Sequence, residues 1–157
     1  AIGTARSSIK LNKATLWSWV LFLAMHYRVG IETPDSNAVG AYMTWFEDLR
    51  VSLKGLNSEP GPKTQAYVAL FNDRSSSRVA DVSSVVIRDL VLWGLLEMSP
   101  TPCDSLCKTA ELRNRAQTAA EHLSWLTARN ATDTVTDAAL EAELVERALG
   151  SGWGDIR

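Results

Sequence analysis

The side chains best suited to binding chemistry lie in one short basic segment of the sequence. Lys108, Arg113 and Arg115 fall at the expected start of a helix. Because a helix N-terminus has free N–H groups and a partial positive charge, cations placed there favour a bound phosphate. Neutral hydrogen-bonding side chains follow in the same segment: Asn114, Gln117 and Thr118. The alternative interpretation is a solvated helix start, in which Glu111 and Glu121 pair with the arginines.

The sequence has no catalytic or metal-binding motif. It contains no G-x-S-x-G, P-loop, G-x-G-x-x-G or H-E-x-x-H pattern. His26 and His122 are single and far apart, which does not favour a histidine-activated nucleophile. Cys103 and Cys107 lack the second pair of Cys or His ligands that structural zinc needs. We therefore expect free cysteines, no enzymatic activity, no cofactor and no metal.

Composition indicates one folded domain and not a disordered chain or a polycation. The chain has 157 residues, 46% of them hydrophobic, and a formal net charge of −2. That length is near the usual size of one domain. Residues 1–31 hold four cations and no acid, whereas residues 131–157 hold six acids and two cations. A basic start and an acidic end suit head-to-tail contacts between copies, although two ordinary solvated faces would have the same composition.

The most apolar run spans residues 16–25 and follows Lys10 and Lys13, as the apolar region of a signal peptide would. The residues after it, from His26 to Arg28, do not form a small-residue cleavage site. The run is also too short to cross a bilayer, which takes about 20 residues. We expect a buried core helix here, no membrane association and a cytosolic protein.

Helical periodicity accounts for most of the chain. The expected helices span 14–28, 36–56, 79–97, 109–129 and a shorter stretch between a capping box at 134–137 and a C′ glycine at 150. Asp35 or Ser36 can cap the second helix. The third is apolar nearly all round, which predicts burial in the core or by neighbours in an assembly. A Pro-Gly-Pro break at 60–62 precedes a short extended strand at 66–71, and a short polar loop reaches Lys108.

These elements predict an all-α fold: a four-helix bundle with a short C-terminal helix and a minor extended segment. The single domain, 1–157, would have a basic N-terminal arm at 1–13, a helical bundle at 14–149 and a tail at 150–157. Most of the six tryptophans lie on helical stretches and are expected in the core or in interfaces. Trp153 differs because it follows the last helix, so it needs a pocket on its own chain or on a neighbour.

The C-terminal segment 145–153, VERALGSGW, resembles the tail of rod-shaped plant virus coat proteins of the tobamovirus type, in the Virgaviridae. That tail pattern is an aromatic or apolar residue, Glu, three residues, Gly, two residues and Trp. The segment 71–73, FND, stands where that family has a Phe-Pro-Asp turn before its third helix, and 46–48, FED, resembles part of its second helix. The sequence departs from the family at Asn72, which replaces a proline, and at 97–100, which lacks the family's arginines.

The resemblance implies a four-helix bundle of coat-protein type that packs side by side into a helical rod. The inner ends of the third and fourth helices would face genomic single-stranded RNA. Arg113 and Arg115 match the basic start of the family's fourth helix and would bind phosphates, with Lys108 and Asn114 beside them. Bases would lie against Gln117 and Thr118. Such binding would be largely independent of RNA sequence, because phosphate contacts position the nucleic acid without specifying it.

The resemblance also implies carboxylates that face each other between subunits and repel when ionised. Asp48 and Asp89 match the positions of one such pair approximately, and Glu97 and Glu111 bracket the inner loop as another. An ordinary surface carboxylate is the alternative interpretation for each. With such pairs, the assembly is expected to tighten at mild acid.

The predicted function is therefore a structural coat protein of a virion in the host cytoplasm. Its partners would be single-stranded RNA and many copies of itself, with no membrane. One alternative is a cytosolic helical adaptor or regulator whose aromatic surface binds a protein partner. Another is a small ligand-binding bundle with a Trp-rich core that lines a pocket.

Overall fold

A computed structural model describes residues 11–29, 34–55, 62–77, 79–129 and 138–153. The predicted all-helical class is confirmed over these residues, which contain no strand. The helices and the one 3-10 turn, η1, have these bounds: α1 Lys13–Val29, α2 Ser36–Gly55, α3 Pro62–Ser76, α4 Val82–Gly94, η1 Leu96–Met98, α5 Cys103–Leu106, α6 Ala110–Arg129 and α7 Ala138–Gly150. None of the described helices combines the length and the hydrophobicity that a membrane-spanning helix needs.

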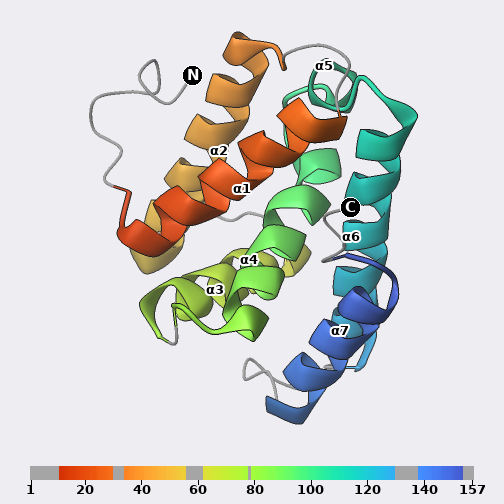
Figure 1. Ribbon diagram of the computed structural model, residues 1–157. Coiled ribbons are helices and arrows are strands. Elements are labelled where there is room, and N and C mark those ends of the chain that lie inside the picture. The colour runs from red at the N-terminus through yellow and green to blue at the C-terminus, as the bar shows by residue number, and fades with distance from the viewer. Residues whose placement is uncertain (1–10, 30–33, 56–61, 78, 130–137, 154–157) are drawn as a thin grey trace.

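Helix α4 forms the centre of the bundle. It runs through the middle of the molecule, with α1 and α2 to one side and α6 and α7 to the other (Figure 1). It packs against α1, α3, α6 and α7. From Val86 to Gly94, every residue except Asp89 is buried. The prediction of a helix buried on nearly all sides is therefore met by the chain's own helices.

A cluster of aromatic side chains holds α1, α2 and α4 together. The ring of Trp19 meets Phe22, Tyr42 and Phe46 edge-on, with centroids 5.6, 5.7 and 5.7 Å apart. Phe22 also packs on Trp93 of α4, at 4.7 Å. Burying each ring stabilises the fold by roughly 1.5–3 kcal/mol, and edge-on pairs add to that.

A buried polar network connects α1, α2 and α3. The indole of Trp19 donates to Glu47 Oε1 at 2.9 Å, and Arg50 Nε donates to Glu47 Oε2 at 2.9 Å. Arg50 Nη1 then donates to Asn72 Oδ1 at 2.8 Å. Because buried charges are tolerated only when paired and hydrogen-bonded, this network fixes how the three helices pack.

The predicted strand at 66–71 is wrong, because these residues lie within α3. A short apolar run fits either a strand or a buried helix, and sequence periodicity alone does not separate them. Here Tyr67, Val68 and Phe71 face the core while Ala66 and Ala69 are exposed, which is a helical pattern. The expected turn at 71–73 also lies inside α3. Pro62, expected in a break, is instead the first residue of the helix, where its missing N–H costs nothing.

Other boundaries also differ from the predictions. The helix expected at 79–97 is shorter, since α4 is followed by η1. The loop to Lys108 is not simply polar, because it contains α5 and buries Leu106 and Cys107. Asp35 caps α2: its Oδ1 accepts the N–H of Asn37 at 2.9 Å. The capping box at 134–137 and most of the predicted N-terminal arm lie outside the described residues.

Candidate functional site

The predicted phosphate-binding residues divide into two groups in the structure. On α6, Arg113, Asn114 and Gln117 are exposed, one turn or less apart along the helix, and Lys108 is exposed just before it. Arg113 Nη1 donates to the carbonyl of Cys107 at 3.2 Å and lies 3.8 Å from Asp104 Oδ1. Thr118 and Arg115 are partly buried instead. The exposed group is the part that a ligand can reach.

Arg115 points into the bundle and pairs with Asp89. Its Nη2 lies 2.7 Å from Asp89 Oδ2, and both side chains are largely covered. The guanidinium lies over the ring of Trp153 at 3.8 Å and over that of Trp93 at 5.3 Å. The indole N–H of Trp153 donates to the same Asp89 oxygen at 3.0 Å. Asp89, Arg115 and Trp153 therefore form one polar cluster that joins α4, α6 and the end of α7.

The chain positions Trp153 through a helix cap. Gly152 has φ 82°, a left-handed conformation that favours glycine. Its N–H donates to the Leu149 carbonyl at 3.0 Å, and the Trp153 N–H donates to the Ala148 carbonyl at 3.0 Å. This pair of bonds is the Schellman motif, which turns the chain back over the helix it ends. The predicted C′ glycine at 150 is wrong by two residues, because α7 runs through Gly150 and Gly152 takes that role.

Burial controls the electrostatics of this cluster. Removal from water raises the pKa of Asp89, and the charge and hydrogen bond of Arg115 and the hydrogen bond of Trp153 oppose that rise. Burial likewise lowers the pKa of Arg115, and Asp89 opposes the change. The Asp89 carboxylate is thus held by a cation and an indole of its own chain. The pocket that Trp153 needs lies on the same chain.

The other candidate carboxylates lie at the surface. Asp48 is exposed on α2, Glu97 in η1 and Glu111 in the first turn of α6. Asp89 is different, since Arg115 and Trp153 cover it. Of the four carboxylates predicted to lie between subunits, Asp48, Glu97 and Glu111 are therefore exposed, and Asp89 is not.

The histidines and cysteines lie in separate places. His26 Nδ1 is 2.9 Å from the Phe22 carbonyl, and the imidazole stacks on Trp93 at 4.9 Å. Burial lowers its pKa. His122 Nε2 lies 3.1 Å from Ser151 Oγ. Both cysteines are free thiols. In the described parts of the chain, no group of three or more His, Cys, Asp or Glu side chains could hold a metal ion.

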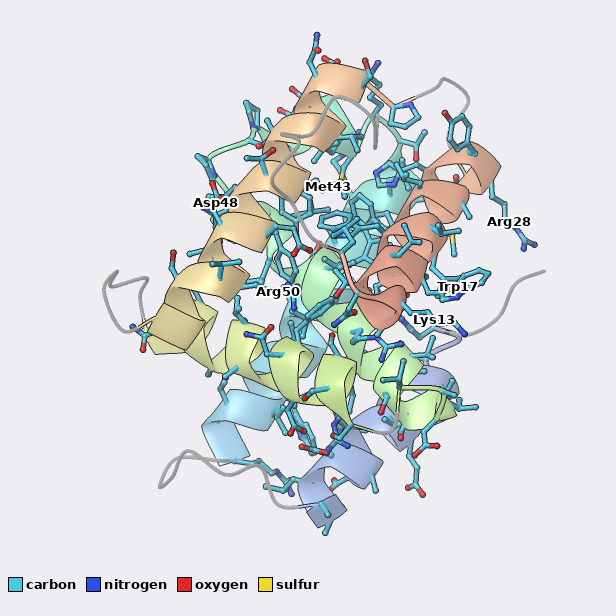
Figure 2. All side chains as sticks on the ribbon, turned by 90° about the vertical axis from the view of Figure 1, so that its left-hand side faces the viewer. Lys13, Trp17, Arg28, Met43, Asp48 and Arg50 are labelled. Carbon is cyan, nitrogen blue, oxygen red and sulfur yellow. The ribbon has the colours of Figure 1, made fainter. Side chains whose placement is uncertain are left out.

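The outer face of α1 is a feature that the sequence reasoning missed. Its inner face buries Trp19, Phe22 and several small or polar residues. Its outer face leaves four large apolar side chains in solvent: Leu16 is 41% exposed, Trp17 56%, Val20 38% and Leu21 38%. Trp17 points away from the bundle in Figure 2. The prediction of a buried core helix is thus only half right, and the apolar residues around the whole helix were the signal for an exposed apolar face.

Compared with known proteins, the chain matches no family model, no curated protein and no solved structure. Its candidate sites are the apolar outer face of α1, the exposed basic start of α6, and the Asp89–Arg115–Trp153 cluster.

Proposed function

We propose that this protein is a structural coat protein whose copies assemble into a helical rod around single-stranded RNA. The observation that carries the proposal is the apolar outer face of α1. Leu16, Trp17, Val20 and Leu21 form one stripe of exposed carbon on a helix whose other face is already packed. Burial of such a stripe against another chain is favourable by about 25 cal/mol per Å², and exposed apolar stripes commonly mark interfaces.

The exposed start of α6 supports the RNA part of the proposal. Arg113, whose side chain is 52% exposed, shares an accessible face with Asn114 and Gln117. One copy offers few cations, so it would release few counterions and bind RNA weakly. In a rod, the Arg113 side chains of successive copies would form a row along the RNA strand. Arg115 contributes by fixing the orientation of α6 through Asp89, and the proposal assigns direct phosphate contact to Arg113.

The tail pattern at 145–153 also supports the proposal. It is the part of the sequence that most resembles rod-shaped virus coat proteins, and its Trp153 fixes the positions of α4, α6 and α7. A subunit that must repeat identically many times needs such rigid relative positions of its helices. The proposed repulsion between subunit carboxylates falls to Glu97 and Glu111, which are exposed in η1 and in the first turn of α6.

Sedimentation velocity with and without single-stranded RNA at low salt tests the proposal. We expect large species that grow further with RNA, and a Trp17→Ser variant that stays small. An Arg113→Gln variant should assemble by itself but lose most of the growth with RNA. A wild-type chain that forms only one-to-one complexes with a protein partner, and neither assembles nor binds RNA, would instead favour the adaptor.

A further inference from the structure

We infer that the outer face of α1 on one copy docks into a groove along α2 of the next copy, in a head-to-tail contact. The inference rests on the proposed function and names the surface that the apolar stripe covers. Its basis is a match of shape and charge between two surfaces of the same chain.

The donor surface is an apolar stripe with a cation at each end. Lys13 lies at the first residue of α1 and Arg28 in its last turn, both exposed. Trp17 and Leu21 lie between them on the same side, one turn apart. Lys13, Trp17 and Arg28 all point away from the bundle in Figure 2. At a rise of about 1.5 Å per residue, the two cations are about 22 Å apart along the helix axis.

The acceptor surface is an open groove of ≈ 510 Å³ along α2. Four of its seven described lining residues are small, and Trp45 is the large one among them. Asp48 lies at one end, and the exposed Asp35 caps the helix at the other. The described residues that line the groove are Ser36, Asn37, Gly40, Ala41, Thr44, Trp45 and Asp48. The two carboxylates are about 20 Å apart along the axis.

The two surfaces complement each other in charge, size and spacing. Two cations flank large apolar side chains on α1, and two carboxylates at nearly the same separation flank mostly small residues and Trp45 on α2. Large side chains that enter a groove lined mostly by small ones give close packing, and opposite charges at both ends favour this partner over a like-charged one. Two α1 faces would instead bring like charges together, so a symmetric α1–α1 contact is disfavoured.

The donor surface on α1 and the acceptor surface on α2 lie on different sides of the subunit. Asp48 and Trp17 lie on opposite sides of the view in Figure 2. Each copy can therefore use α1 toward one neighbour and α2 toward another. When copies join through two different surfaces, the first and last copies of the row each keep one surface free. Further copies can therefore add without limit, unless the row closes into a ring. This is the geometry that a rod requires.

A charge-exchange experiment tests the inference. The first variant carries Lys13→Glu and Arg28→Glu, which reverses the donor surface. The second carries Asp35→Asn and Asp48→Lys, which changes the acceptor surface while Asn keeps the helix cap. Light scattering with a fixed amount of single-stranded RNA measures the critical concentration of assembly. Each variant alone should raise it about tenfold, because like charges then face each other.

An equimolar mixture of the two variants should restore assembly to within about threefold of wild type, since each altered surface then meets its complement. The matched control is Asp81→Lys, which reverses an exposed carboxylate just before α4 whose side chain makes no capping hydrogen bond. This variant alone should assemble like wild type, and it should not rescue the first variant. Circular dichroism checks that every variant is folded.

The outcomes separate the inference from the proposed function. Wild-type assembly that neither folded variant weakens, or that the mixture fails to restore, would overturn the α1–α2 contact and leave the coat-protein proposal standing. A wild-type chain that stays monomeric at all concentrations would overturn both, because no second copy would then occupy the groove.

Discussion

Arg115 on α6 and Asp89 on α4 are joined by an ion pair of 2.7 Å, and Trp153 covers it from the end of α7. Three helices that are distant in sequence thus meet at one pair of charges. Sequence patterns suggested a different use for each residue: phosphate binding for Arg115, and repulsion between subunits for Asp89. Their contact gives both a role in holding a single subunit together.

Removal of either charge of the pair should destabilise the fold strongly. Arg115→Met leaves Asp89 covered without its cation, and loss of one partner of a buried pair costs roughly 3 kcal/mol or more. Arg113→Met, two residues earlier on the exposed side of α6, should change the free energy of unfolding by less than about 0.5 kcal/mol. Urea denaturation of both variants measures the difference. Equal effects would mean that the Asp89–Arg115 pair does not stabilise the bundle.

Trp153 should stabilise the fold both through the packing of its ring and through the hydrogen bond of its N–H. Trp153→Phe keeps an aromatic ring over Arg115 but removes the hydrogen bond to Asp89, which we expect to cost about 1 kcal/mol. Trp153→Ala also removes the buried ring, for a total of roughly 3–5 kcal/mol. Thermal unfolding at equal protein concentration compares the two. If Trp153→Ala is as mild as Trp153→Phe, the ring does not pack as the structure places it.

The two glycines near the end of α7 should respond in opposite ways. Gly152→Ala forces a side chain into the left-handed region, at a cost of about 1–2 kcal/mol. Gly150 lies in the helix, and a methyl group there would meet no atom within 4 Å. Gly150→Ala should therefore be neutral or stabilise by up to about 1 kcal/mol. Chemical denaturation distinguishes them, and a destabilising Gly150→Ala would show that the cap begins at Gly150 after all.

Acid should weaken the fold through His26. Burial lowers its pKa in the folded protein below the ordinary value of 6.5, so the unfolded chain takes up a proton first. The stability that neutral His26 contributes is thus present above about pH 6.5 and is lost as the pH falls below it. His26→Phe keeps a ring on Trp93 without a titrating group. Its melting temperature, measured from pH 5 to 7.5, should fall less than that of wild type. Parallel curves would contradict a buried neutral histidine.

Asp89 acts in the opposite direction. Because the pKa of Asp89 is raised, the folded protein takes up a proton there before the unfolded chain does. The contribution of Asp89 to the stability of the fold therefore grows as the pH falls toward that pKa. Comparison of His26→Phe with wild type cancels this contribution, because both chains contain Asp89.

The sequence predicted the helices well where periodicity was long and the caps were local. The predicted helices at 14–28 and 109–129 lie within one residue of α1 and α6 at each end. The prediction of a strand at 66–71 was wrong because periodicity cannot separate a short strand from a buried helix, and packing against α1, α2 and α4 decides its state.

The candidate site was harder to predict from sequence than the fold. Arg113 and Arg115 are two residues apart, so on a helix they point in different directions, and only one can reach a ligand on the exposed side. The partner of Arg115 lies 26 residues earlier and its cover 38 residues later, at Asp89 and Trp153. Such contacts between distant residues leave no local pattern. The exposed stripe on α1 is also hard to predict, because the sequence of an apolar helix does not show which of its faces the rest of the chain covers.

Negative-stain electron microscopy of the purified protein, with and without single-stranded RNA at pH 5.5 and 7.5, tests the coat-protein proposal most directly. The proposal predicts rods or disks that lengthen with RNA and are favoured at pH 5.5, because repulsion between facing carboxylates of neighbouring subunits weakens in acid. Isolated monomers or dimers under all four conditions, with no RNA bound at low salt, would contradict it.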